Sequence, residues 1–372
     1  MAPDEDRLIQ IFFDLVAINA ISKQEKPVAD YIRKFLGYLD IEATEDQTGE
    51  KINGTTGNII AKITQGGQTN IPGFSFAAHM DTVKATQGIQ PQIKHGTIYS
   101  DGNTILGADN RAGIAMILYL VENLKKNNLA HLPFEIIFTV GEETGLYGST
   151  NLNLNLVQSR LAYILDSSAD PGYFVYSAPW AMDFEIEFLG KASHAAVNPE
   201  KGINALSMAG DLIQNFKVGK IDSHTTINFG KISGGEASNV IPSRIILSGE
   251  IRSFYQKNID KYHAELVTQL QRIQTKFNGK YNLRSESAFP GFVLDRESEA
   301  IQRLSECMKS VGLDPHPIRY HGGSDANVLN NRGIVAIDLG IGAKNPHGFD
   351  EHIKIQDMID IVRLIHQLVL IS

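Results

Sequence analysis

The segment FEIIFTVGEE, residues 134–143, combines the two features that decide the fold prediction. Its first seven residues form a largely apolar run, which is typical of a buried strand. Two adjacent glutamates, Glu142 and Glu143, follow at once. Like charges at the end of a buried strand repel each other and are hard to desolvate. These glutamates therefore either lie in water at a surface turn, where most glutamates are found, or face a cation.

The segments around this run alternate between apolar strands and amphipathic helices. We expect further strands at residues 58–63, 74–81, 161–166 and 333–342, and helices at 6–18, 28–39, 112–127, 298–312 and 355–370. This alternation predicts an α/β fold in which a mixed, mostly parallel sheet is sandwiched by helices.

The middle of the chain has a different pattern. The stretch DFEIEFLG, residues 183–190, alternates polar and apolar residues, which favours a sheet with one face in water. The elements that follow complete the order β-α-β-β-α-β, the ferredoxin-like arrangement. Because 372 residues favour two domains, we predict a catalytic domain from residues 1–178 and 293–372, with an inserted α+β lid domain at 179–292.

Composition excludes several classes of protein. With 34 basic and 42 acidic residues the net charge is -8, which argues against a nucleic-acid partner. The sequence has no long apolar segment that predicts a membrane span, and its N-terminus does not resemble a secretory signal. The single cysteine, Cys307, excludes a thiolate zinc site and fits a cytoplasmic location.

Residue types that bind metals follow the predicted strands of the large domain. His79 and Asp81 end one strand, Asp166 ends another, Asp109 begins a helix, and His347 lies in the loop after the strand at 333–342. In open α/β sheets, sites collect at the carboxyl ends of strands. Each residue also has an ordinary explanation, such as a helix cap for Asp109 or a hydrogen-bonded core position for His79. Their joint occurrence at one sheet edge favours a metal site.

A pair of divalent ions would suit amide hydrolysis. Zinc lowers the pKa of bound water to roughly 7, and two ions roughly 3.5–4 Å apart can share the resulting hydroxide and polarise a carbonyl. We assign Asp109 as the bridge, His79 and Asp166 to one ion, and Glu143 and His347 to the other. Three carboxylates and one hydroxide would balance the charge of two divalent ions, which are zinc or alternatively cobalt or manganese.

This assignment leaves Glu142 free, although it is adjacent to a ligand. Neighbours on an extended chain point in different directions, so Glu142 can face the water while Glu143 faces the metal. We predict that Glu142 is the general base, which takes the proton of the water and passes it to the leaving amine. Asp81 is predicted to orient the imidazole of His79.

The sequence resembles the co-catalytic zinc exopeptidases, and the resemblance covers nearly the whole chain. It rests on the stretches HMDTV (79–83), GADNRAG (107–113), GEETGLYGS (141–149), HAAVNPEKGINA (194–205), GGEASNVIPS (234–243) and GGSDANVLNNRG (322–333). This family includes peptidase T, aminoacylase, glutamate carboxypeptidase and succinyl-diaminopimelate desuccinylase. The order of the motifs is most similar to the peptidase T-like branch of tripeptide aminopeptidases. The resemblance implies the same metal ligands and a cis peptide bond between Asp109 and Asn110.

The resemblance also implies substrate-binding residues in the lid domain. His194 would help to stabilise the oxyanion in the active site of a partner subunit, so a homodimer through the lid is expected. Arg252 would bind a substrate carboxylate, although an ordinary ion pair on a strand face is the alternative. Asn239 would lie near the substrate. Ser324 and Asp325 are further candidates for lining the site.

These observations predict a dinuclear-metal aminopeptidase that acts on di- and tripeptides. An N-acyl-amino-acid amidohydrolase (deacylase) or a carboxypeptidase of the same family is the alternative, and a non-catalytic metal-binding protein is a more remote one. The stretch HGFDEH, residues 347–352, departs from many relatives of this branch, which have Thr after the histidine. That departure bears on the substrate class and leaves the ligand in place.

Overall fold

The computed structural model describes residues 3–65 and 73–370, and the chain divides into two compact units. Unit 1 combines the chain up to Ser177 with the chain from Val293 onward, and unit 2 is Ala178–Phe292. Each unit has its own hydrophobic core. None of the helices in the described part of the chain has the length and apolar character that a membrane crossing requires.

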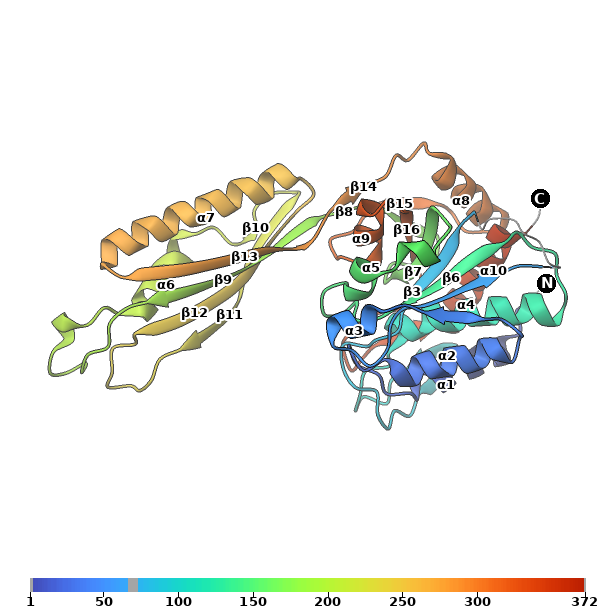
Figure 1. Ribbon diagram of the computed structural model, residues 1–372, viewed down its shortest axis with the longest axis horizontal. Helices are drawn as coiled ribbons and strands as arrows, with labels where there is room; N and C mark the ends of the chain where they lie inside the picture. Colours follow the sequence, from blue (N-terminus) through green and yellow to red (C-terminus); the bar gives the residue numbers. More distant parts are fainter. Residues whose placement is uncertain (1–2, 66–72, 371–372) are drawn as a thin grey trace. The chain divides into compact units, whose positions relative to one another are not determined.

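A nine-stranded sheet forms the centre of unit 1 (Figure 1). Its order is β1 (Ala43–Glu45), β2 (Ile59–Ile63), β6 (Phe134–Thr139), β3 (Ser75–His79), β7 (Leu161–Ser167), β16 (Val335–Gly340), β8 (Tyr173–Ala178) and β14 (Phe292–Val293), with β15 (His316–Arg319) paired to β8. Strands β6, β3, β7 and β16 run parallel, while β1, β2 and β8 pair in antiparallel fashion. A small antiparallel sheet contains β4 (Gln92–Lys94), β5 (Thr97–Tyr99) and β17 (His352–Lys354).

Helices flank the large sheet, as predicted. They are α1 (Glu5–Val16), α2 (Lys26–Gly37), α3 (Thr48–Ile52), α4 (Ala108–Lys126), α5 (Tyr147–Asn151), α8 (Glu299–Ser310), α9 (Asp325–Asn331) and α10 (Ile355–Val369), with a short 3₁₀ helix at Leu154–Leu156. Helix α4 packs on β3 and β7, with α1 and α10 against it. All six residues of β6 are buried, as expected for a central strand of a covered parallel sheet. The predicted mostly parallel α/β fold is confirmed.

Unit 2 contains an antiparallel sheet with two helices. Its order is β10 (Gly219–Lys220), β11 (Thr225–Gly234), β12 (Arg244–Ser253), β9 (Trp180–Leu189) and β13 (Lys280–Phe289), and the helices are α6 (Ala205–Asn215) and α7 (Gln256–Phe277), with a 3₁₀ turn at Pro199–Lys201. Apart from the two-residue β10, this is the β-α-β-β-α-β order that the sequence predicts. The helices cover one face, where Phe184, Ile186 and Phe188 of β9 pack with Leu212 of α6 and Leu270 of α7.

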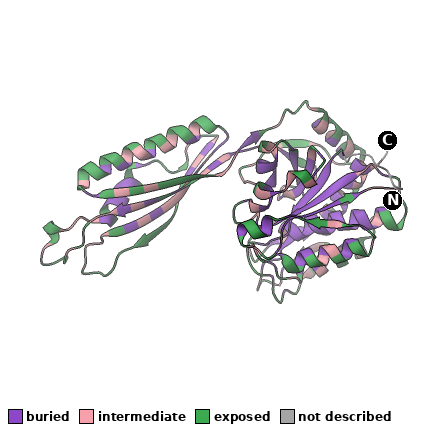
Figure 2. Cartoon of the chain, viewed as in Figure 1, coloured by how far each residue is buried: buried purple, intermediate pink, exposed green. Residues whose placement is uncertain are grey.

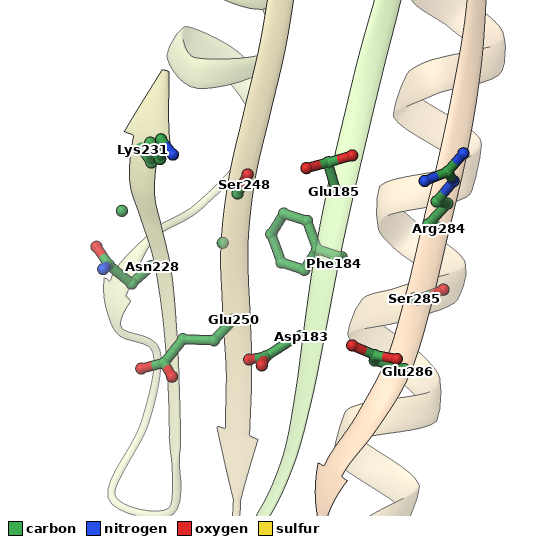
Figure 3. Close-up of a pocket in the computed structure, with 12 residues that line it drawn as sticks. Asp183, Phe184, Glu185, Asn228, Lys231, Ser248, Glu250, Arg284, Ser285 and Glu286 are labelled. Atoms are coloured by element: carbon green, nitrogen blue, oxygen red, sulfur yellow. The ribbon is translucent and has the colours of Figure 1, made fainter. Parts of the chain in front are cut away.

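The other face of this sheet is exposed and charged. Alternate residues of β9 point to it, so Asp183 and Glu185 are exposed while Phe184 and Ile186 are buried. Figure 2 shows the mixture of buried and exposed positions along the strands of this sheet. A hollow of about 790 Å³ lies over this face. In Figure 3, Asp183 lies beside Glu250 of β12 and Glu286 of β13, its partners in the strand register. Its lining residues all belong to unit 2, and none of the predicted metal ligands is among them.

Candidate metal centre

The five predicted metal ligands lie on five different segments of unit 1. His79 is the last residue of β3, Asp166 lies near the end of β7, and Glu143 lies in the turn after β6. Asp109 lies at the start of α4, where its backbone (φ -84°, ψ 100°) is not yet helical and the Asp109–Asn110 peptide bond is cis, as the resemblance implies. His347 lies in the loop between β16 and β17. Parallel pairing brings the ends of β3, β6 and β7 to one edge of the sheet.

These segments bring all five side chains together around Asp109. One carboxylate oxygen of Asp109, Oδ1, lies 2.9 Å from Nε2 of His79, and Oδ1 of Asp166 lies 3.3 Å from that same nitrogen. The other oxygen of Asp109, Oδ2, lies 3.4 Å from Nε2 of His347, which is 2.9 Å from Oε1 of Glu143. Asp109 is therefore shared by two groups of ligands, and each group adds one imidazole and one further carboxylate.

Hydrogen bonds among the five side chains leave an oxygen of Glu143 unsatisfied, and the spacing of the side chains suits a bound cation. Oε1 of Glu143 is buried and makes no hydrogen bond within the described part of the chain, although Nε2 of His347 is 2.9 Å away. One ligand atom from each of His79, Asp109 and Glu143 lies within 4.8 Å of the others, which is a spacing that one metal ion can span. A buried carboxylate oxygen without a donor is costly unless a cation binds it. His, Asp and Glu are donors that suit zinc.

The electrostatics of the cluster favour positive charge at two points. Burial opposes protonation of His79, but the carboxylates of Asp166 and Asp109 outweigh it and raise the pKa of His79 well above its usual value. The carboxylates of Asp109 and Glu143 raise the pKa of His347 to about 10. Burial raises the pKa of Asp166 to about 7. Carboxylates that favour a proton on each imidazole also favour a divalent cation between themselves and that imidazole.

Asp81 connects His79 to the turn that carries the two glutamates. Nδ1 of His79 donates to the backbone carbonyl of Asp81 at 3.0 Å and lies 3.4 Å from its carboxylate. The same carboxylate accepts the backbone N–H groups of Glu142 and Glu143, each at 3.1 Å. Burial raises the pKa of Glu142 well above its usual value. Asp81 therefore orients an imidazole and the predicted general base together.

Two residues that the sequence analysis did not assign also hold the cluster. Nδ2 of Asn110 donates to Oδ1 of Asp166 at 2.8 Å, and its Oδ1 accepts the N–H of Gly113. The hydroxyl of Ser22 donates to Asp81 at 2.6 Å. Asn110 could have been suspected because it follows Asp109, the predicted bridging ligand. Ser22 is 59 positions from Asp81, and nothing in the sequence connects them.

Ser324 and Asp325 are buried in unit 1 and have structural partners. The Ser324 side chain caps α9 by accepting the N–H of Ala326, and the backbone N–H of Ser324 is held in return by Asn327. Asp325 accepts a hydrogen bond from the hydroxyl of Thr139 at the end of β6. Thr139 and Asp325 thus connect β6 to α9.

The remaining predicted residues lie in unit 2. The loops of His194 and Asn239 are neighbours, because the N–H of Ala195 donates to the carbonyl of Asn239 and His194 bridges to Val240. Arg252 of β12 forms an ion pair with Glu250, with Nη2 2.9 Å from Oε2, and its guanidinium lies over the ring of Phe289. The ion pair that was the alternative for Arg252 is therefore present.

Comparison with known proteins identifies the family. Residues 75–371 match Peptidase family M20/M25/M40. The uncharacterized protein YqjE of Bacillus subtilis is 29% identical over 362 residues, 97% of each chain. A tripeptidase from Staphylococcus aureus matches with a TM-score of 0.94 at 29% identity, and aminopeptidase PepT from Bacillus cereus with 0.89 at 30%; each match covers 99% of this chain and 98% of the other. The resemblance to the peptidase T-like branch is thus confirmed, and the chain belongs to Peptidase family M20/M25/M40.

Proposed function

We propose that this protein is a dinuclear-metal aminopeptidase that cleaves short peptides, with Glu142 as its general base. One observation carries the proposal. The two oxygens of Asp109 face two different histidines, and each histidine lies within 3.3 Å of a further carboxylate. A single metal ion would need only one of these groups of ligands, whereas a pair of ions sharing a carboxylate would use both.

We assign five residues of the chain to binding the metal ions and one to proton transfer. A bound pair of divalent ions acidifies water and polarises the carbonyl of the substrate. His79, Asp109, Glu143, Asp166 and His347 would hold the ions. Glu142 would accept a proton from the attacking water and deliver it to the amine that leaves. Asp81 would hold Glu142 and His79 in position relative to each other through the hydrogen bonds described above.

We propose zinc as the native metal. Two imidazoles and three carboxylates are hard to borderline ligands, which zinc accepts, and cobalt or manganese would also fit them. Metal analysis by mass spectrometry of protein purified without added metal would show which metal is bound. Two equivalents of zinc are expected, and two equivalents of manganese or cobalt would replace this part of the proposal.

The substrate class is supported by the tripeptidase and by aminopeptidase PepT, which match nearly the whole chain at 29% and 30% identity. We propose that Arg252, His194 and Asn239 of the inserted domain bind the peptide. For Arg252 this requires that a substrate carboxylate compete with Glu250 for the guanidinium. The free α-amine of the peptide would distinguish an aminopeptidase from a deacylase.

A matched pair of substrates tests the proposal. We expect metal-loaded protein to cleave an unblocked tripeptide, and a chelator to abolish the cleavage. The N-acetylated form of the same tripeptide should be cleaved far more slowly. Preferred cleavage of the acetylated peptide would replace the aminopeptidase by a deacylase, release of the C-terminal residue would indicate a carboxypeptidase, and cleavage of neither would reject the proposal.

We also propose a homodimer that forms through the inserted domain, in the cytoplasm. Helix α6 supports the dimer, because Leu206 is 50% exposed and Ile213 is 42% exposed, and Gly210 lies on the same face with open space around it. The unpaired cysteine Cys307 supports a reducing compartment. Sedimentation of the wild type and of a Leu206→Asp, Ile213→Asp variant tests the dimer. A monomeric wild type would reject it.

A further inference from the structure

Two buried glutamates near the metal centre have no part in the mechanism above. Glu25 is 0% exposed and Glu351 is 1% exposed. Neither belongs to the predicted metal ligands. A carboxylate is rarely buried to this extent unless hydrogen bonds or cations compensate its lost hydration. The donors that these two carboxylates use therefore indicate what they do.

Glu351 holds the backbone of the bridging acid. Its Oε1 accepts the N–H of Asp109 at 3.0 Å, and its Oε2 accepts the N–H of Gly107 at 2.7 Å. Gly107 has a positive φ of 74°, so the chain turns sharply just before Asp109. Glu351 itself lies four residues after His347. One side chain thereby ties the segment of the bridging acid to the segment of a terminal ligand.

Glu25 holds the turn that carries the general base. Its Oε1 accepts the N–H of Gly141 at 2.9 Å and that of Lys23 at 2.7 Å. Glu25 stands at the N-cap of α2, yet its side chain caps none of that helix's own N–H groups. The next two N–H groups of the turn, those of Glu142 and Glu143, go to Asp81. Two carboxylates from distant segments thus fix three consecutive peptide groups.

We propose that Glu25 and Glu351 are positioning residues, which set the general base and the bridging carboxylate, respectively, through backbone N–H groups. The inference rests on the proposed function, because it assigns the two residues to that centre. Side chains that orient ligands through such bonds typically change metal affinity or activity by about 10- to 100-fold when they are replaced.

The two glutamates should respond differently to substitution by glutamine. Both bonds of Glu25 go to Oε1, and Oε2 has no hydrogen-bond partner in the described part of the chain. Glutamine at position 25 keeps one oxygen and can therefore keep both bonds. Glu351 uses one oxygen for each donor, so glutamine must turn an NH₂ group toward a backbone N–H. Glu351→Gln thus breaks a bond that Glu25→Gln preserves.

Glu135 offers a matched control for Glu351. It is fully buried in β6 and also binds backbone N–H groups with both oxygens, those of Gln158 and Ser159, at 2.8–3.0 Å. These bonds hold the loop before β7, at the start of the strands and not at their carboxyl ends. Glu135→Gln therefore breaks a hydrogen bond of the same kind, but to a segment that carries none of the predicted metal ligands.

The first measurement is the release of zinc from the loaded full-length protein to a coloured chelator. We expect Glu351→Gln to weaken zinc binding by about 10- to 100-fold and Glu135→Gln to leave it within about threefold, with a comparable fall in melting temperature for both. Equal zinc binding in the two variants would overturn the role of Glu351. This readout needs no peptide, so an inactive wild type that binds zinc would reject the proposed function alone. A wild type that binds no zinc would reject both.

The second measurement separates kcat from KM for the tripeptide. We expect Glu25→Ala to lower kcat by about 10- to 100-fold with little change in KM or zinc content, and Glu25→Gln to restore kcat to within about threefold of the wild type. A merely structural glutamate would lower the melting temperature in both variants without this difference in kcat. Equal kcat values for Glu25→Ala and the wild type would overturn the role of Glu25. If Glu25→Ala does not fold, a tenfold loss of kcat in Glu25→Gln would overturn it instead.

Discussion

The two units of this peptidase use their acidic side chains in opposite ways. In unit 1, Asp81, Glu25 and Glu351 are fully buried and accept backbone N–H groups beside the candidate metal centre. In unit 2, Asp183 and Glu286 lie on an exposed sheet face (Figure 3). A carboxylate in water is easily replaced, whereas a buried one must have donors or a cation. The comparison predicts that loss of a carboxylate affects catalysis in unit 1 and hardly affects even stability in unit 2.

The largest effect is expected at Asp109. Asn at this position keeps one oxygen where two oxygens face two histidines, and it also removes the negative charge. Asp109→Asn should therefore weaken metal binding by more than about 100-fold, beyond the usual loss for an outer hydrogen-bond partner, with a corresponding loss of peptide cleavage. Metal content after dialysis measures this, with Glu185→Gln of unit 2 as the exposed control. Two tightly bound ions in Asp109→Asn would mean that the bridging role is wrong.

A different pattern is expected for the adjacent glutamates of the turn. Glu142→Gln should lower kcat by about 10²- to 10⁴-fold, since general acid–base catalysis contributes that much, and should keep its metal. Glu143→Gln should lose metal, because it removes the charge of a buried carboxylate whose Oε1 makes no hydrogen bond to any described residue. Metal analysis and kcat on the same preparations separate the two roles. If Glu142→Gln lost metal as Glu143→Gln does, Glu142 would have to be counted as a ligand.

The sequence predicts the architecture well where the pattern is strongly periodic. The strands at β3, β6 and β7 and the order of elements in unit 2 follow from apolar runs and alternation. Short elements such as β1 and α9 were not predicted, because three to seven residues give too little periodicity to distinguish them from loops. Their conformation depends on the neighbours that the fold supplies, as β1 depends on pairing with β2.

The meeting of the candidate ligands at one place could be predicted for a physical reason that does not apply to the residues that hold them. Metal-binding residue types at the ends of parallel strands must meet at one edge, so topology alone brings them together. Glu25 and Ser22 lie in the pattern S-x-x-E before a helix, which ordinarily indicates a capping box. In the structure Glu25 accepts the N–H of Gly141 as well as that of nearby Lys23, and Ser22 donates to Asp81. Local pattern could not reveal contacts made between residues more than fifty positions apart.

Asp211 is the informative exception in unit 2. This buried carboxylate of α6 is bound by Lys276 and Arg272 of α7, which lower its pKa. Its contribution to stability is thus complete above the unfolded pKa of about 3.9 and is lost as the pH falls through the lower folded pKa. Asp211→Asn should cost about 1 kcal/mol at pH 7, because both cations are half exposed, and the difference from the wild type should narrow below about pH 4. Urea denaturation at both pH values measures this, and a difference that does not depend on pH would contradict it.

Asp183 should show the smallest effect and the opposite dependence on pH. Partial burial, followed by the nearby charge of Glu250, raises the pKa of Asp183. The ionised form is therefore disfavoured in the folded protein at neutral pH, and this penalty disappears as the pH falls through the raised folded pKa. Asp183→Asn should be as stable as the wild type or more stable by up to about 0.5 kcal/mol at pH 7, with no gain in acid. The urea midpoints of Asp183→Asn and the wild type, measured at pH 7 and in acid, test the gain expected at pH 7 and its absence in acid. A loss of more than about 1 kcal/mol would mean that this exposed carboxylate makes a stabilising contact, and the contrast between the two units would then fail at the residue where it is expected to be clearest.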